Sequence, residues 1–170
     1  LEKGGRPMKR RIMLVIGFVS LALFLFVAPP SFAEKTIKVG FVDTYSGPPS
    51  VYTFDVLDGF RMVVDKVNEK GGVLGRKIEH MTRDEKFKPD VGLAMAKELV
   101  MREKVDILAG TINSSATLAI SDFARKEKIP FICSFAKSEK ITGEQGHRYV
   151  FSVAENTRMI GKAAAVALSK

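Results

Sequence analysis

Short apolar runs alternate with longer segments of helical period along most of the chain. The runs are of strand length and predict β-strands at residues 37–42, 77–82, 105–109, 129–133 and 149–152. Between them, apolar positions recur every three or four residues and predict helices at residues 52–70, 89–102, 115–126 and 156–169. The predicted order is βαβαβαβ, followed by one more strand and one more helix.

Each of the first three predicted helices carries an apolar stripe that can pack on a sheet. The stripes consist of Val56, Phe60, Val63, Val64 and Val67, then Leu93, Ala96, Leu99 and Val100, then Leu118, Ala119 and Phe123. The runs at 105–109 and 129–133 are apolar on both strand faces, which is typical of a parallel sheet covered by helices on both sides. Right-handed crossovers then predict a doubly wound α/β layer.

Residues 8–33 have the pattern of a secretory signal peptide. A cationic start, Met-Lys-Arg-Arg, precedes an apolar run over residues 12–28, and Pro-Pro-Ser-Phe-Ala follows it. We expect cleavage after Ala33 and a periplasmic location for residues 34–170. The alternative is an uncleaved membrane anchor, since an apolar run of about 17 residues is at the lower limit for spanning a bilayer. Residues 1–7 precede the first Met and are left out of the fold.

Outside this segment, the net charge says little about function. The formal net charge is +8, but residues 34–170 keep 22 basic and 18 acidic groups. Basic residues there lie beside acidic ones without interleaved aromatics, so no nucleic-acid partner is expected. The single cysteine, Cys133, lies in an apolar run, which predicts a core position.

Ligands of open parallel sheets bind beyond the carboxyl ends of the strands, which directs attention to the loops after the first, third and fourth strands. In the third loop, Asn113, Ser114 and Ser115 lead directly into a helix, so that N–H groups and hydroxyls converge at the positive end of its dipole. This predicts a carboxylate or phosphate site. The plainer alternative is that Asn113 or Ser114 only caps the helix, and the two roles are compatible. In the first loop, Ser46-Gly47-Pro48 is either a close backbone approach to the ligand or only a turn.

No catalytic constellation is apparent. His80 and His147 have no partner at ligand or nucleophile spacing, and Ser114 lacks the glycine elbow of serine hydrolases. Residues 71–77 contain three glycines but follow a helix and precede a strand, which predicts a turn and not a phosphate loop. Asp84 and Glu85 are interpreted as turn residues. We therefore expect a binding protein with no catalytic residues, metal or cofactor.

Four motifs are specific enough to compare with known families. They are Ile-Lys-Val-Gly at 37–40, Ser-Gly-Pro at 46–48, Asp-Gly-Phe at 58–60 and Val-Asn-Glu-Lys-Gly-Gly-Val-Leu-Gly-Arg-Lys-Ile-Glu at 67–79. Together they resemble the opening of the leucine/isoleucine/valine-binding proteins, and the resemblance continues to residue 170. It implies the first lobe of a type I periplasmic-binding fold, in a two-lobed receptor that closes on a small amino acid or related carboxylate and docks on an ABC permease.

The resemblance also implies site residues. Ser114 matches a serine that holds the ligand carboxylate, and Tyr52 matches an aromatic beside the ligand side chain. Ala136 and Lys137 match a backbone carbonyl and a threonine around the ligand's amino group. A lysine there would repel a ligand ammonium. Either Lys137 points away, or the ligand is a carboxylate without an amine.

The family's chains cross into a second lobe and return. The resemblance therefore implies that residues 34–154 form an incomplete N-terminal ligand-binding lobe and that residues 155–170 begin the crossover to a second lobe that this chain lacks. A lone lobe is expected to expose apolar surface. The alternative function is a membrane-anchored extracellular sensor domain of the same fold.

Overall fold

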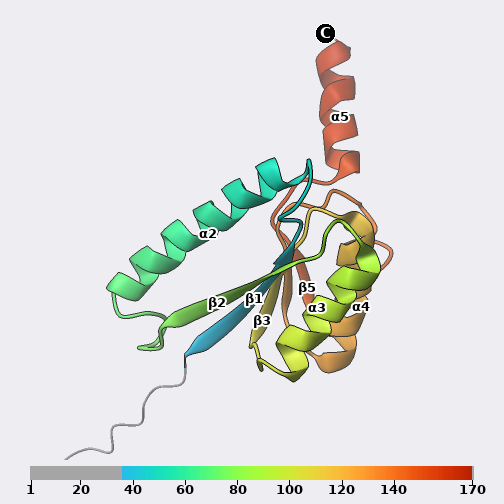
Figure 1. Ribbon diagram of the computed structural model, residues 1–170. Coiled ribbons are helices and arrows are strands. Elements are labelled where there is room, and N and C mark those ends of the chain that lie inside the picture. Colours follow the sequence, from blue (N-terminus) through green and yellow to red (C-terminus); the bar gives the residue numbers. More distant parts are fainter. Residues whose placement is uncertain (1–35, 170) are drawn as a thin grey trace, which may run out of the picture. The chain divides into compact units, whose positions relative to one another are not determined.

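Parallel strands and helices alternate in the computed structural model, which describes residues 36–169 (Figure 1). The predicted signal peptide and residues 1–7 lie outside this range. The strands are β1 (Ile37–Asp43), β2 (Ile78–Asp84), β3 (Ile107–Gly110), β4 (Phe131–Cys133) and β5 (Val150–Ser152). The helices are α2 (Ser50–Glu69), α3 (Pro89–Met101), α4 (Ser114–Glu127) and α5 (Thr157–Leu168). Every strand and helix predicted within this range is therefore confirmed.

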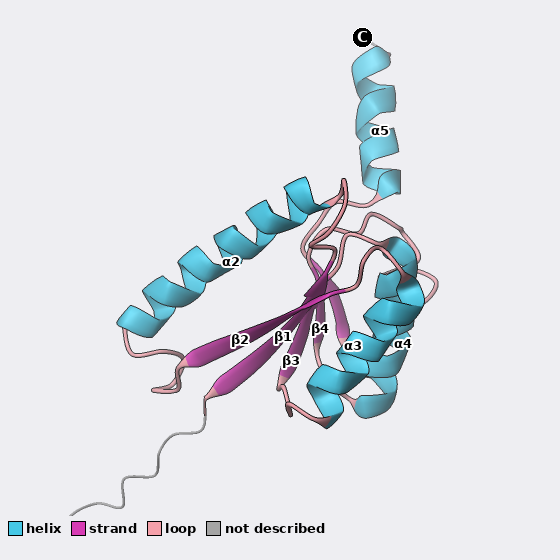
Figure 2. Ribbon diagram, viewed as in Figure 1, coloured by secondary structure: helices cyan, strands magenta, loops and turns pink. Residues whose placement is uncertain are grey.

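The sheet has the order β2-β1-β3-β4-β5 and all of its pairings are parallel. Because the chain moves outward from β1 in both directions, the predicted doubly wound topology is confirmed. Figure 2 shows α2 on one side of the sheet and α3 with α4 on the other.

Strands β3 and β4 begin later than predicted, at Ile107 and Phe131. The N–H of Val105 donates to the Leu99 carbonyl of α3, so this apolar residue serves the core without joining the sheet. The N–H of Ile129 donates in the same way to the last turn of α4. An apolar run thus predicts burial more reliably than it predicts ladder pairing.

The face under α3 and α4 carries the larger core. Val42, Leu108 and Phe131 of the sheet pack there against Leu99 and Ile120 of the two helices, and each of these side chains is buried. Cys133 belongs to the same cluster and is fully buried, which confirms its predicted core position. On this face the predicted stripe of α3 is confirmed, with Leu93 half-buried at its edge.

Two predicted stripes need correction. In α2 the buried positions are Thr53, Leu57 and Val64, whereas Val63 is 55% exposed. In α4 the buried face is centred on Ile120, and Leu118 lies at its margin. Small and hydroxyl side chains such as Thr53 occupy buried positions here, and the pattern of apolar residues alone does not predict them.

The face under α2 is only partly covered. Its buried apolar residues are Val39, Phe41, Leu57 and Ala109. A groove of about 470 Å³ runs between α2 and the strands, lined by apolar side chains that include Phe60, Ala109 and Ile132. The resemblance led us to expect an exposed apolar surface of this kind on a lone lobe.

Two further segments complete the description. Residues 71–77 form the predicted turn, closed by a bridge between Val73 and Arg76. At Gly72 a Cβ atom would lie 2.0 Å from the Arg76 carbonyl oxygen, so only glycine fits there. Helix α5 buries none of its side chains. Within residues 36–169, no helix combines the length and apolarity needed to cross a bilayer.

Candidate functional site

The loops after β1, β3 and β4 meet at one edge of the sheet. Val42 pairs with Gly110 and Gly110 pairs with Cys133, so the three strands end together. Figure 2 shows the corresponding loops gathered at the edge where α2, α4 and α5 begin. Ser46, Ser114 and Ala136, which follow these three strands, therefore lie on the same edge.

Hydrogen bonds join these loops to one another. The Ile112 N–H donates to Asp43 Oδ1 at 2.8 Å, and the Ala136 N–H donates to the Thr111 carbonyl at 3.0 Å. The close approach of the strands depends on Gly110, where φ is +116° and a Cβ atom would lie 1.8 Å from the Val42 carbonyl oxygen. The edge is thus one connected surface.

The amino end of α4 is capped by Asn113. Its Oδ1 accepts from the N–H groups of Ser115 (3.0 Å) and Ala116 (3.3 Å), and its own N–H donates to the Thr111 hydroxyl. Among the residues described, the N–H of Ser114 is the one backbone N–H in the first turn of this helix without a partner. Ser114 is half-buried and Ser115 is exposed. Fewer N–H groups are therefore free at this helix start than predicted, since those of Ser115 and Ala116 donate to the Asn113 cap.

Ser46 is exposed and lies beside Asp84 at the end of β2. Partial burial raises the pKa of Asp84, whereas the Lys86 N–H and the Ser46 hydroxyl lower it, and the net shift is downward. Asp84 also accepts from the Tyr45 N–H at 3.0 Å. Asp84 therefore has the turn role predicted from the sequence, and it holds the Ser46 loop.

Tyr52, Phe135 and Lys137 form a group beside this edge. The rings of Tyr52 and Phe135 have centroids 5.9 Å apart, and the Lys137 ammonium lies 4.6 Å from the centre of the Phe135 ring. The same ammonium pairs with the Glu155 carboxylate and lowers the pKa of that group. Because Glu155 balances the lysine charge, Lys137 does not by itself exclude a ligand with an amine.

Ala136 is buried and takes part only through its backbone. Its carbonyl accepts a long contact of 3.7 Å from the Cys133 thiol. The next carbonyl, that of Lys137, accepts from the Thr157 N–H at the start of α5. The backbone at 136–137 therefore joins the edge to α5.

Two buried carboxyl groups lie directly beneath the loops. Asp43 ends β1, and its Oδ1 accepts from the N–H groups of Thr44 and Ile112. Glu85 follows β2, and its Oε1 accepts from the hydroxyls of Thr44 and Thr111, each at 2.9 Å. Burial raises the pKa of Asp43 to about 6 and that of Glu85 to about 7.

The turn role predicted for Glu85 is therefore incomplete, because its side chain is fully buried. The sequence did contain a signal, since a threonine directly follows both β1 and β3 and acidic residues end both β1 and β2. In a parallel sheet these positions fall on the same edge.

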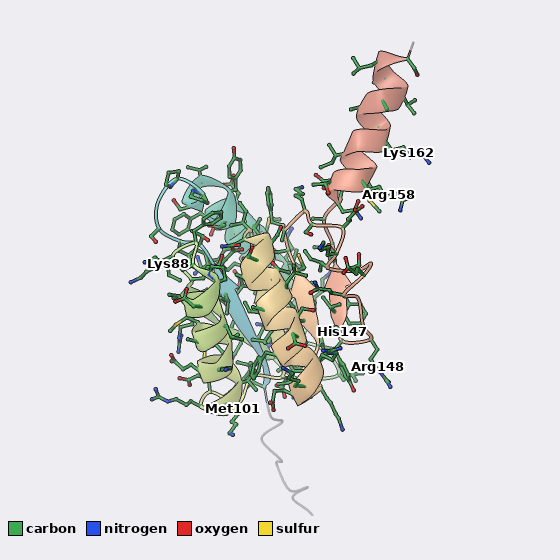
Figure 3. The ribbon with its side chains drawn as sticks, turned by 90° about the vertical axis from the view of Figure 1, so that its right-hand side faces the viewer. Lys88, Met101, His147, Arg148, Arg158 and Lys162 are labelled. Carbon is green, nitrogen blue, oxygen red and sulfur yellow. The ribbon has the colours of Figure 1, made fainter. Side chains whose placement is uncertain are left out.

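The two histidines lie elsewhere. Figure 3 shows His147 lower in the view than Lys88, which precedes α3, and the His147 ring contacts the middle of α4. His147 Nδ1 accepts from the Tyr149 N–H, so its proton is on Nε2, which lies 3.0 Å from the Ser121 carbonyl and 2.8 Å from the Ser121 hydroxyl. A protonated Nε2 cannot take the serine proton. His80 accepts from Arg61, and burial lowers its pKa.

No cluster of His, Cys, Asp or Glu within residues 36–169 is arranged to hold a metal ion. What the edge offers is a free N–H at a helix start, neighbouring hydroxyls and an aromatic pair. This arrangement suits binding of an anion with an apolar body.

Comparisons with known proteins identify the family of this chain. The family model described as periplasmic binding protein matches residues 36–170. The leucine-specific-binding protein of Salmonella typhimurium is 30% identical over 148 residues, covering 86% of this chain and 38% of that protein.

Two solved structures are similar in fold. One is a branched-chain amino acid transporter substrate-binding protein of Streptococcus pneumoniae in complex with isoleucine, with TM-score 0.66 and 30% identity over 71% of this chain and 34% of its own. The other is a solute-binding protein of an R. palustris ABC transporter in complex with benzoate, with TM-score 0.72 and 28% identity over 78% of this chain and 36% of its own. The chain thus spans little more than a third of these relatives, and it belongs to the periplasmic binding protein family.

Proposed function

We propose that this chain supplies the first ligand-binding lobe of an extracytoplasmic receptor of an ABC importer. The ligand is a small monocarboxylate with an apolar body, held between two lobes without covalent chemistry. The observation that carries this proposal is the free N–H of the half-buried Ser114 at the start of α4, on the same edge as the first and fourth loops.

In this proposal the ligand carboxylate accepts from the N–H and hydroxyl of Ser114 and from the hydroxyl of Ser115. The positive end of the α4 dipole favours a negative charge there. Asn113 keeps the helix start open by capping the two following N–H groups. The apolar body of the ligand lies against Tyr52, while Ser46 borders the site.

The relatives support this ligand chemistry. Isoleucine and benzoate, bound in the two similar structures, share a carboxylate and an apolar body but not an amine. The carbonyl of Ala136 would accept from an ammonium, and Lys137, balanced by Glu155, permits one. The carboxylate is therefore the constant part of the proposed ligand, and the amine is optional.

The partner that we propose is an ABC permease, because the relatives belong to such transporters. We also propose that residues 8–33 direct export to the periplasm, that residues 34–154 form the lobe and that residues 155–170 lead toward a second lobe. Mass spectrometry of the exported protein tests the first of these points. A start at Glu34 supports it, whereas retention of Met8 favours the anchored sensor.

Isothermal titration of the full-length protein with leucine, isoleucine and benzoate tests the function. We expect saturable binding of at least one of them. An absence of heat with every carboxylate in a folded sample would contradict the proposal.

A further inference from the structure

Glu85 occupies the junction of three loops at the carboxyl edge. Its backbone N–H donates to the Asp43 carbonyl at 2.9 Å, which continues the β1–β2 pairing by one residue. Its side chain then turns inward, where Oε1 accepts from Thr44 of the first loop and Thr111 of the third loop. All three side chains are fully buried. One carboxyl oxygen therefore joins the ends of β1, β2 and β3.

Each threonine leads to a different wall of the proposed ligand site. The Thr44 carbonyl accepts from the Thr53 hydroxyl, and Thr53 is the neighbour of Tyr52 in α2. The Thr111 hydroxyl accepts from the Asn113 N–H at 2.9 Å, and Asn113 caps α4 beside Ser114. The apolar wall and the anion-binding wall are thus both connected to Glu85.

The second oxygen of Glu85 explains a glycine in α3. Oε2 is buried without a hydrogen-bond partner, and a Cβ atom at Gly92 would lie 2.7 Å from it. The same Cβ position lies 3.3 Å from the Ala116 Cβ, so Oε2 is enclosed between the first turns of α3 and α4. The carboxyl group is therefore held by two hydrogen bonds at Oε1 and lies against the first turn of α3 at Oε2.

We propose that Glu85 is a positioning residue for ligand binding, which sets the placement of Ser114 relative to Tyr52 through its hydrogen bonds to Thr111 and Thr44. This inference rests on the proposed function of the edge. Glu85 itself does not touch the ligand.

A pH-dependent affinity follows from this position. The acidic groups that act on Glu85 are Asp43 at the end of β1 and Asp84 in β2, and the Tyr45 phenol lies nearby in the first loop. On the helix side, Gly92 of α3 lies against Oε2, and Ala116 of α4 lies beside Gly92. Because burial raises the pKa of Glu85 to about 7, its charge changes near neutral pH. A bound carboxylate disfavours the ionised form, so by linkage the ligand binds more weakly as Glu85 ionises.

The test measures carboxylate affinity of the full-length protein between pH 6 and pH 8, using leucine or benzoate, whichever binds. In the wild type we expect affinity to fall as pH rises. Glu85→Gln retains an oxygen that can accept from both threonines, so we expect affinity within about threefold of wild type at pH 6. Its pH profile should be flatter than that of the wild type. Glu85→Leu removes both hydrogen bonds, and we expect a loss of about tenfold or more.

Two controls keep the test decisive. Glu98→Gln removes a carboxylate that pairs with Arg83, away from the loops, and should leave affinity and its pH profile unchanged. Should Glu85→Leu fail to fold, Thr111→Val removes the hydroxyl that donates to Glu85 and accepts from the Asn113 N–H, while Glu85 remains. This variant should weaken binding with the pH dependence retained.

The outcomes separate the two proposals. A wild type that binds no carboxylate overturns the function. A wild type that binds, together with a Glu85→Gln variant that keeps the wild-type pH slope, or with Glu85→Leu or Thr111→Val at wild-type affinity, overturns the role of Glu85 alone.

Discussion

The two faces of the sheet differ in how completely they are covered. Under α3 and α4, side chains such as Leu108 and Phe131 are fully buried in one continuous core. Under α2, a groove of about 470 Å³ remains between helix and strands. Because successive residues of a strand point to opposite faces of the sheet, adjacent residues lie in environments that differ in how completely they are covered. The difference indicates that the stability of this lobe comes mainly from the α3–α4 face. Helix α4 also begins at the edge that is proposed to bind the ligand.

Neighbouring residues of β3 test this difference with the largest expected effect. Leu108→Ala should lower the free energy of unfolding by about 2–5 kcal/mol, because Leu108 is fully buried between the sheet and two helices. Ile107→Ala, on the groove side of the same strand, should cost about 1 kcal/mol. Urea unfolding measures both, and equal losses would show that the two faces are equivalent.

The two buried carboxyl groups at the carboxyl edge should also give the stability a pH dependence. The raised pKa values of Asp43 and Glu85 mean that the folded state holds more protons than the unfolded state between about pH 4 and pH 7. The free energy of unfolding should therefore fall as pH rises from 5 to 8, by on the order of 3 kcal/mol from Glu85. Glu85→Gln should flatten this decline in urea titrations at several pH values. A wild type whose stability rises over this interval would refute the assignment.

Two helical glycines sharpen the contrast. Gly92→Ala places a Cβ atom 2.7 Å from Glu85 Oε2 and should destabilise the lobe by about 1–3 kcal/mol. Gly59→Ala in α2 meets no atom within 4 Å and should stabilise it by up to about 1 kcal/mol. Thermal unfolding of both variants gives the signs, and stabilisation by Gly92→Ala would contradict the packing described for α3.

The smallest effect concerns two asparagine caps. Asn113→Ala should cost about 1 kcal/mol, because its side chain caps two N–H groups of a buried helix. Asn156 caps α5, which buries no side chain. Asn156→Ala should therefore change global stability by only a few tenths of a kcal/mol. Urea midpoints compare the two. A larger loss from the α5 cap would mean that α5 contributes more to the fold than its exposure indicates.

Periodicity was sufficient to predict the order of elements and the parallel sheet, because burial on one or both faces controls where apolar residues lie. It failed where buried positions are not apolar. Thr53 and Ser121 are buried in helices, and their hydroxyls gave no apolar signal. Val63 is apolar but exposed, since the α2 side is only partly covered.

The placement of the candidate site residues at one edge was predictable, but the hydrogen bonds among the loops were not. Strand-end loops identified Ser46 and Ser114, because parallel topology places such loops on one edge. That Asn113 would occupy two N–H groups depends on its rotamer, and that Glu85 would be buried depends on Thr44 and Thr111, which are distant in sequence. Tertiary hydrogen bonds of this kind leave no spacing pattern.

Comparing a carboxylate with its amide in the same receptor tests the central claim most directly. Titration of the full-length protein with leucine against leucinamide, and benzoate against benzamide, isolates the negative charge that the α4 amino end is proposed to bind. We predict that at least one acid binds and that its amide is at least about tenfold weaker, since a charged hydrogen bond is lost. Equal affinity for an acid and its amide would contradict the account.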